Sequence, residues 1–264
     1  MGLHIIVPIK YVPDIERVKF DVEKGRIDRS SAPGEINPFD LHALEAAVQI
    51  KERLGGSITV VSMGPPQAEA ALRDAISRGA DRAILLTDER FAGADTLATS
   101  YTLACALKKL QPFDLVICGE KTVDGDTGQV GPELAEHLGL PHVSYVSEIR
   151  DVSRDGILVV VDMGRSYYLV KLRMPALIVV TKDVNKPRLP TLRDKLRARR
   201  AKVEIWNADV LADIADMSRF GYIGSPTTVH RITFPEERGR KARIFTGVNA
   251  IEELLKVLEV VLKW

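Results

Sequence analysis

One stretch of the chain combines glycines with small polar side chains in a pattern that could hold a nucleotide. It covers residues 119–133, Gly-Glu-Lys-Thr-Val-Asp-Gly-Asp-Thr-Gly-Gln-Val-Gly-Pro-Glu. The apolar run before it, residues 115–118, predicts a buried parallel strand, and residues 134–138 after it predict a short helix closed by Gly139. In open α/β sheets, ligands bind at the carboxyl ends of strands, often against a helix N-terminus. The stretch therefore lies where a ligand-binding loop is expected.

The side chains of this loop suit a nucleotide in several ways. Gly125, Gly128 and Gly131 would allow close approach of the backbone to a ligand. Thr127 and Gln129 can donate hydrogen bonds to phosphate or ring acceptors.

The aspartates and the glycine spacing leave the function of the loop open. Asp124 and Asp126 would repel a phosphate, so we expect them to take ribose hydroxyls or to cap the helix. The spacing matches neither G-x-G-x-x-G nor G-x-x-x-x-G-K-[ST]. From these residues alone, a nucleotide loop and a merely Gly-rich turn are both possible.

A second polar cluster predicts the start of a helix. Asn37 can cap, Pro38 fits the first helical position, and Asp40 places a carboxylate near the positive end of the helix. Gly55 and Gly56 then end the helix. The simplest interpretation is a good cap with no ligand.

The elements that position these residues alternate between strand and helix. Residues 18–21 and 26–28 predict a small hairpin. Strands are predicted at residues 3–7, 57–63, 83–86 and 114–118, with helices between them, and Asp95 is the predicted cap of the helix before residue 114. This order predicts a doubly wound, mainly parallel α/β sheet of Rossmann-like type with helices on both faces. Four further runs, residues 142–149, 157–162, 167–172 and 176–181, have no helical pattern between them and predict an antiparallel β extension.

Three segments together resemble the electron transfer flavoprotein beta subunit. They are the loop at residues 123–132, Asn-Pro-Phe-Asp at residues 37–40, and Asn-Lys-Pro-Arg at residues 185–188. They stand in that family's order, and the resemblance runs from about residue 3 to about residue 205. The Gly-rich sequence of the loop is more similar to the family's electron-bifurcating branch than to the simple electron carriers. Gly125 and Gly128 have no side chains and could leave room for an isoalloxazine ring.

The resemblance implies a heterodimer in which an alpha subunit holds the main FAD. This chain would hold a second FAD in the bifurcating branch, where NADH gives a hydride and the two electrons take different paths. In a simple electron carrier the same site would hold AMP. The chain would be an electron carrier on its own, and part of an NADH-dependent oxidoreductase complex if bifurcating.

The family's nucleotide contacts carry over to residues at the ends of three predicted strands and at one helix cap. They are Pro8, Asn37, Pro38, Phe39, Asp40, Met63, Gly119, Thr122, Val123, Asp124, Gly125, Asp126, Thr127, Gly128, Gln129 and Val130.

A basic segment follows the predicted sheet. Residues 182–202 hold nine Lys or Arg against two Asp, in a chain whose net charge is +1. A solvated basic helix would explain this pattern, and the aromatic residues typical of single-strand nucleic-acid binders are missing from it. The resemblance implies that dehydrogenase or quinone oxidoreductase partners dock here, through Val184, Asn185, Pro187 and Arg188, by attraction of acidic surfaces. Some members carry a leucine anchor between the strand and this motif, and Val184 is the nearest apolar residue here.

The end of the chain predicts a helix at residues 208–220, a strand-like run at 228–234, a charged stretch at 236–243, and a last amphipathic helix. Its apolar stripe is formed by Ile251, Leu254, Leu255, Leu258, Val261 and Leu262. The stripe could pack on its own domain, while the resemblance implies an arm that embraces the alpha subunit. We therefore expect residues 1–205 to be a nucleotide-binding domain, with the extension at 142–181 and the docking segment at 182–202, and residues 206–264 to contact the partner.

Composition limits the other functions. With 45% apolar and 28% charged residues, the chain is typical of soluble proteins. Two cysteines, no signal-peptide pattern and no long apolar run predict a cytoplasmic protein without membrane insertion. The residues predict no catalytic group and no metal site. A nucleotide-activating enzyme would need a Gly-rich loop after the first strand, where Pro8-Ile-Lys-Tyr stands instead, and a regulatory AMP-binding module stays possible.

Overall fold

The structure is a computed structural model that describes residues 2–13, 19–21, 26–28, 34–228 and 244–261. Contacts divide the chain into two compact units, Met1–His230 and Arg231–Trp264. The first unit contains the α/β sheet, and the second contains helix α7 (Ala250–Val261). The functional division expected at residue 205 stays a prediction.

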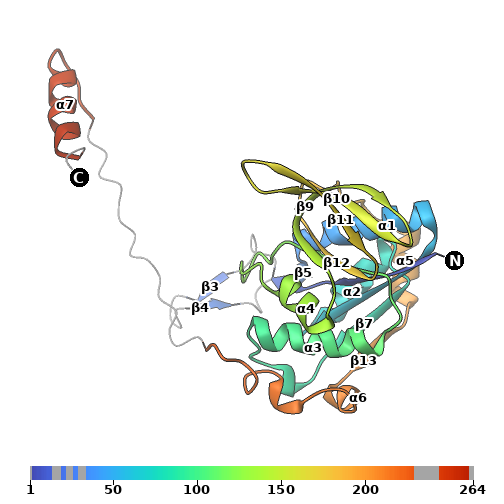
Figure 1. Ribbon diagram of the computed structural model, residues 1–264. Coiled ribbons are helices and arrows are strands. Elements are labelled where there is room, and N and C mark those ends of the chain that lie inside the picture. The colour runs from blue at the N-terminus through green and yellow to red at the C-terminus, as the bar shows by residue number, and fades with distance from the viewer. Residues whose placement is uncertain (1, 14–18, 22–25, 29–33, 229–243, 262–264) are drawn as a thin grey trace. The chain divides into compact units, whose positions relative to one another are not determined.

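A nine-stranded sheet forms the centre of the first unit (Figure 1). Its strands, in spatial order, are β11 (Tyr167–Arg173), β10 (Gly156–Asp162), β9 (His142–Val152), β12 (Ala176–Val180), β8 (Leu115–Gly119), β1 (Leu3–Pro8), β6 (Gly56–Met63), β7 (Arg82–Leu86) and β13 (Val203–Trp206). The strands from β9 to β13 in this order run parallel to one another, and β10 pairs antiparallel with both β9 and β11. The predicted fold class, a mainly parallel doubly wound sheet with an antiparallel extension, is confirmed.

The extension differs from the prediction in one strand. All four runs at 142–181 were expected to be antiparallel, but β12 lies inside the parallel sheet, between β8 and β9. Its sequence Ala-Leu-Ile-Val-Val is buried at every residue, which is typical of a parallel strand covered on both faces. The antiparallel part is therefore β9–β11.

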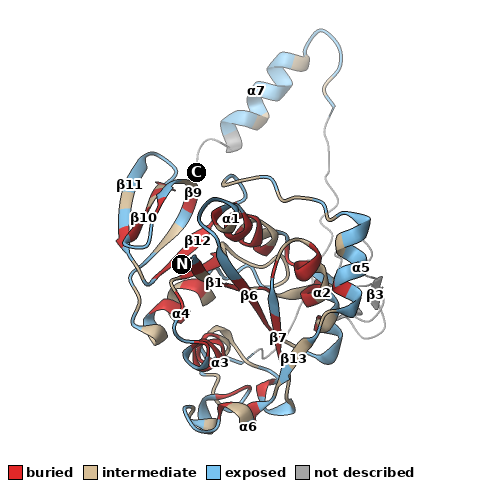
Figure 2. Ribbon diagram, turned by 90° about the vertical axis from the view of Figure 1, so that its right-hand side faces the viewer, coloured by how far each residue is buried: buried red, intermediate tan, exposed pale blue. Residues whose placement is uncertain are grey.

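Helices cover both faces of the sheet. One face carries α1 (Pro38–Leu54), α2 (Glu69–Ser77) and α5 (Leu192–Arg200), and the other carries α3 (Thr96–Lys109), α4 (Val130–Leu138) and α6 (Ala208–Leu211). The apolar side chains of these helices and of alternate strand residues form two separate clusters, one on each side of the sheet. Figure 2 shows the buried residues concentrated on the strands and on the inward faces of the helices.

Capping explains where several helices begin. The Asp95 carboxylate accepts a hydrogen bond of 3.0 Å from the Ala98 amide and caps α3, as predicted. The expected cap of α1 is wrong: Asn37 stands at the cap position, but its side chain accepts from no backbone amide of the first turn. Pro38 does occupy the first turn of α1, and Gly55, with φ of 72°, ends the helix.

The end of the first unit is less helical than predicted. In place of a helix over 208–220, the chain forms the short α6 and a 3-10 turn at Met217–Arg219. The strand-like run at 228–234 and the charged stretch at 236–243 lie outside the described residues, apart from Thr228. Two short pairs, β2 (Tyr11–Pro13) with β5 (Gly34–Ile36) and β3 (Lys19–Asp21) with β4 (Arg26–Asp28), precede α1, and β3 with β4 is the predicted hairpin.

The strand order reverses direction between β1 and β8. From β1 the chain moves through β6 to β7 on one side, and β8 and β12 lie on the other side. In open α/β sheets this reversal opens a crevice at the carboxyl ends of the two strands, where ligands bind. None of the described helices is both long enough and apolar enough to cross a membrane.

Substitution of Gly131 by Ala should destabilise the fold. A Cβ atom at Gly131 would lie 2.6 Å from Cγ2 of Val179, so α4 would have to move away from β12. We expect the free energy of unfolding to fall by about 1–3 kcal/mol, measured by chemical denaturation. Gly125→Ala is the control, because its nearest neighbour is the Thr122 hydroxyl at 3.2 Å, and it should change stability by less than about 0.5 kcal/mol. Equal stability of the two variants would contradict this account of Gly131.

Candidate functional site

A cavity of about 120 Å³ lies in the crevice between the carboxyl ends of β1 and β8. Its floor is formed by strand ends, and its wall by the Gly-rich loop and the first turn of α4. Nine of the residues expected to bind a nucleotide line it: Pro8, Asp40, Met63, Gly119, Thr122, Thr127, Gly128, Gln129 and Val130. The structure thus brings together residues that lie more than 100 positions apart in the sequence.

Asn37 fixes the loop to the start of α1. Its side-chain amide donates to the Lys121 carbonyl at 2.8 Å, and its side-chain oxygen accepts from the Val123 amide at 3.1 Å. Asn37 is fully buried, so these two bonds have no competition from water. This is why Asn37 does not cap the helix: its side chain is used by the loop.

Two ion pairs tie the loop aspartates to lysines. Lys10, which follows β1, contacts the Asp124 carboxylate at 2.8 Å, and Lys121 contacts Asp126 at 2.7 Å. Neither aspartate caps α4, because its cap position is Gln129, whose side chain makes no capping bond. The pairs reduce the negative charge that the sequence places in the loop, and they bring two ammonium groups to the site.

The turn into α4 presents backbone amides to the cavity. Among the described residues, no hydrogen bond uses the amides of Thr127, Gly128, Gln129 or Val130. Gly128 has φ of 64°, and Asp126 before it has φ of 52°, so the chain turns through left-handed conformations. Unpaired amides at a helix N-terminus form a ready site for an anion such as phosphate.

Asp40 joins the two strand ends beneath the cavity. Its carboxylate accepts from the Lys10 amide at 2.8 Å and lies against the backbone of Gly119. A Cβ atom at Gly119 would meet Oδ1 of Asp40, so glycine is required at this point. Burial raises the pKa of Asp40 to about 7, against the lowering effect of its hydrogen bonds to Lys10, Asn37 and Gly119.

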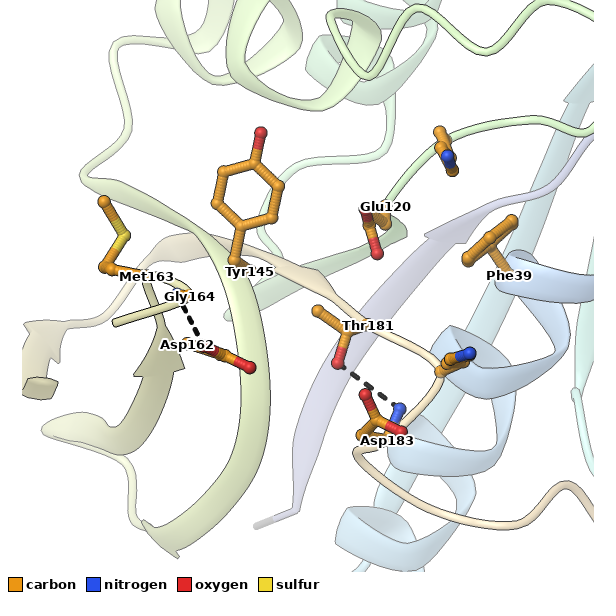
Figure 3. A pocket seen from close by; sticks show the side chains of 10 residues that line it. Phe39, Glu120, Tyr145, Asp162, Met163, Gly164, Thr181 and Asp183 are labelled. Atoms are coloured by element: carbon orange, nitrogen blue, oxygen red, sulfur yellow. Dashed lines mark hydrogen bonds between the residues drawn. The ribbon is translucent and has the colours of Figure 1, made fainter. Parts of the chain in front are cut away.

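A larger hollow of about 570 Å³ adjoins this cavity at Glu120 and Lys121 (Figure 3). It lies at the ends of β8 and β12, against Tyr145 in the first half of β9, and beside the turn between β10 and β11. Phe39 and Tyr145 provide aromatic walls, and the Lys121 ammonium lies 5.8 Å from the centre of the Phe39 ring. Tyr145 has φ of 61°, a strained backbone conformation of a kind that clusters at ligand sites.

A third hollow, of about 630 Å³, adjoins the central cavity on its other side. It lies over the ends of β6 and β7 and shares Met63 with the cavity. The three hollows therefore form a row along the carboxyl edge of the sheet, with the Gly-rich loop at its centre.

Comparison with known proteins agrees with this geometry. The electron transfer flavoprotein domain matches residues 24–211, which include the loop, the start of α1 and the segment after β12. The chain belongs to the electron transfer flavoprotein family. Among the family's members, Protein FixA of Azorhizobium caulinodans is 44% identical over 246 residues, covering 91% of this chain and 87% of that protein.

Two further relatives carry the name of a subunit. The electron transfer flavoprotein subunit beta of Clostridium acetobutylicum is 43% identical over 238 residues, which is 90% of each chain. The subunit of the same name in Thermoanaerobacterium thermosaccharolyticum is 42% identical over 259 residues, covering 97% of this chain and 98% of that protein.

The remaining residues expected to contact a nucleotide lie around the cavity. Phe39 lines the larger hollow, Val123 and Asp124 are half-buried in the loop, and Gly125 and Asp126 are exposed on it. Pro38 is exposed on the first turn of α1.

Sequence reasoning missed several cavity residues. Lys10, Leu103, Glu120 and Lys121 also line the site. Lys10 and Lys121 could have been predicted as site residues, because Lys10 lies shortly after the predicted strand 3–7 and Lys121 shortly after the predicted strand 114–118. Tyr145 gave no signal in the sequence.

The segment expected to dock partners is fixed to α1 by its polar residues. Asn185 donates to the His42 carbonyl at 2.9 Å, and Arg188 pairs with Glu45 at 2.8 Å and with Glu52 at 2.6 Å. Val184 packs partly buried against the apolar cluster of that face. The docking role of Val184, Asn185, Pro187 and Arg188 stays a prediction.

Cys105 and Cys118 are both buried and free, and burial raises the pKa of the Cys118 thiol well above its usual range. Within the described residues, no group of three His, Cys, Asp or Glu side chains could hold a metal ion.

Substitution of Asn37 by Ala should loosen the loop. The Lys121 carbonyl and the Val123 amide would lose their partners, at a cost of about 1–3 kcal/mol in the free energy of unfolding. Hydrogen exchange at the Val123 amide should become faster as well. Gln67→Ala, at an exposed position, is the control and should change neither measurement. Unchanged protection of Val123 would refute this role for Asn37.

The stability of the protein should depend on pH through Asp40. Its pKa of about 7 in the folded state lies above the ordinary value of 3.8, so folding favours the protonated form. The stabilisation is fully present below about pH 4 and is lost as the pH rises through 7. Asp40→Asn, which stays neutral, should lack this loss, and denaturation curves of the two proteins between pH 5 and 8 measure the difference. Parallel pH profiles would be inconsistent with a buried titrating Asp40.

Proposed function

We propose that this chain is the beta subunit of a heterodimeric electron transfer flavoprotein and binds an adenine nucleotide across the crevice between β1 and β8. One observation carries the proposal: residues 127–130, whose amides have no hydrogen-bond partner among the described residues, line a cavity at the point where the strand order reverses. The family and the names of the relatives with 42–43% identity support it.

The row of hollows favours FAD as the bound nucleotide. The central cavity of about 120 Å³ is smaller than the usual 300–1,000 Å³ of small-molecule pockets, so a nucleotide seated there must extend beyond it. Hollows of about 570 and 630 Å³ adjoin it on either side, which gives a dinucleotide room to continue. The alternative is AMP in a simple electron carrier.

The residues of the site would bind and orient the nucleotide. The amides of residues 127–130 would hold phosphate oxygens, and the ammonium groups of Lys10 and Lys121 would balance their charge. Asn37 and Asp40 would keep the loop and the two strand ends in place. FAD, when bound, would supply the redox chemistry, accepting a hydride from NADH or electrons from a dehydrogenase for transfer to the alpha-subunit FAD. We infer electron bifurcation as the mode of transfer, in the cytoplasm.

Two surfaces would contact other proteins. Helix α7 exposes Ile251, Leu254, Leu255 and Leu258, and in the proposed heterodimer this stripe packs on the alpha subunit. Segment 182–202 would receive the dehydrogenase or quinone oxidoreductase. A regulatory AMP-binding module without a redox role is the remaining alternative.

Co-purification with the alpha subunit, followed by a count of flavin and AMP, tests the proposal. Two FAD per heterodimer would identify the bifurcating type, and one FAD with one AMP would identify the simple carrier. A visible spectrum without flavin absorption in the co-expressed pair would overturn the redox function.

Substitution of Asp126 by Ala should weaken retention of the nucleotide. The change removes the ion pair with Lys121 and places Ala in a left-handed conformation that it tolerates less well. We expect the nucleotide to dissociate about two- to five-fold more readily, the size of an exposed ion pair, as measured by nucleotide content after dialysis. Asp151→Ala, at an exposed position of β9, should retain the normal content. Equal retention in both variants would count against the role of Asp126.

A further inference from the structure

Tyr145 of β9 holds a backbone conformation that its side chain disfavours. Its φ of 61° is left-handed, and a bulky residue adopts such a conformation only where the surrounding structure enforces it. Among the described residues, Asp126 of the Gly-rich loop is the only other residue apart from glycine with a positive φ. Tyr145 is 49% exposed, so packing of its ring in the core does not offset the cost of this conformation. Strain at a half-exposed aromatic residue points to a role in binding.

A β-bulge produces this conformation. Ser144 and Tyr145 of β9 stand opposite Val179 of β12 alone, between two regular pairs of these strands. The Thr181 amide donates to the Val146 carbonyl at 2.9 Å, so the pairing resumes directly after the bulge. Bulges redirect side chains and are frequent beside active sites. This one turns the Tyr145 ring toward the hollow of about 570 Å³ that adjoins the central cavity (Figure 3).

The charges of this hollow suit a ring and not a phosphate. Three acidic residues line it, Glu120, Asp162 and Asp183, against the two basic residues Lys121 and Lys182. A phosphate would be repelled by the excess of negative charge. The polar edge of a heterocyclic ring fits better, because carboxylates accept from its N–H groups and ammonium groups donate to its carbonyl oxygens.

Aromatic side chains border this hollow on two sides. In Figure 3, Tyr145 and Phe39 lie on opposite sides of Glu120, which belongs both to this hollow and to the central cavity. The hollow on the other side of the cavity differs, since its aromatic residue Phe91 is 4% exposed and packs edge-on against Phe220, with ring centres 5.1 Å apart. Among the described residues that line the two hollows, an accessible ring face is therefore found only at the hollow beside Tyr145.

We propose that Tyr145 is the residue on which the second ring of a dinucleotide stacks, with the adenine half in the central cavity and the flavin ring in the hollow beside it. Isoalloxazine has the required chemistry: a flat aromatic face, with an N–H group between two carbonyl groups on its edge. The bulge holds the tyrosine in place before the ligand arrives, so little freedom is lost on binding. Because AMP has no second ring, Tyr145 selects FAD over AMP. The inference rests on the proposed function, since it takes the ligand of the central cavity to be an adenine nucleotide.

Competition between the two nucleotides tests this role. The purified heterodimer, with its alpha-subunit flavin in place, is dialysed against radiolabelled AMP and increasing FAD, and the concentration of FAD that displaces half of the AMP is measured. Tyr145→Gly should lower the preference for FAD over AMP about ten-fold, the size of one aromatic stack. The same variant should have a higher midpoint of chemical denaturation, because glycine adopts a positive φ at no steric cost. A tyrosine that served only the fold would show the opposite result, a lower midpoint with an unchanged preference.

Two further variants complete the test. Tyr145→Phe keeps the ring and the strained backbone, and it should retain the preference for FAD within about two-fold. Tyr168→Gly is the matched control, because Tyr168 is 56% exposed, lies in regular pairing on β11 and does not line the hollow. This change should lower the denaturation midpoint and leave the preference unchanged.

The outcomes separate this inference from the proposed function. An equal preference for FAD in the unaltered protein and in Tyr145→Gly would overturn the stacking role, and so would AMP that FAD does not displace. An unaltered site that retains neither nucleotide would refute the proposed function itself. A preference that falls in Tyr145→Gly but not in Tyr168→Gly would support both.

Discussion

The candidate site depends on one buried carboxyl group, that of Asp40. Asp40 lies beneath the crevice, where β1 and β8 part, and it joins the backbone after one strand to the end of the other. Burial of a carboxylate is unfavourable, and its cost appears as the raised pKa of Asp40. The group nevertheless fixes the spacing of two strands whose ends form the floor of the cavity. Gly119 is part of the same constraint, because any side chain there would meet Asp40.

A second layer of polar contacts builds on this floor. Asn37 holds the loop by two buried hydrogen bonds, and the lysine–aspartate pairs hold its outer part. These bonds fix the loop, and within the described part of the chain the amides of the turn into α4 have no hydrogen-bond partner beside the cavity. The loop thus separates two tasks: its side chains attach it to the protein, and its backbone is left for a ligand.

Much of this arrangement could be predicted from the sequence, because it depends on local patterns. Apolar runs marked the strands, Asp95 marked the start of α3, and the Gly-rich loop fell after a buried strand, as expected of a binding site. The prediction was wrong where contacts between residues far apart in the sequence determine the role of a side chain. Asn37 has the residue type of a cap, but a loop 84 residues away uses its side chain. Gly131 lines the cavity, but its close contact with Val179 of β12 could not be read from the residue type.

Other features could not be predicted because they depend on which strands become neighbours. The run Ala-Leu-Ile-Val-Val of β12 fits an antiparallel strand and a parallel one, and its place between β8 and β9 decides the matter. The left-handed backbone of Tyr145 likewise follows from the irregular pairing of β9 with its neighbours. Arg188 was expected to contact a partner protein, but in the folded chain it forms ion pairs with Glu45 and Glu52 of α1. The sequence does not show that these residues become neighbours.

The antiparallel extension makes β11 an edge strand of the described sheet. This strand exposes Tyr167, Tyr168 and Leu169 at one end and charged Lys171 and Arg173 at the other. Unpaired strand borders with apolar side chains invite pairing with another chain, and lysine or arginine discourages it. The apolar half of this edge is therefore the part of the described sheet that is most open to pairing with a strand of another chain.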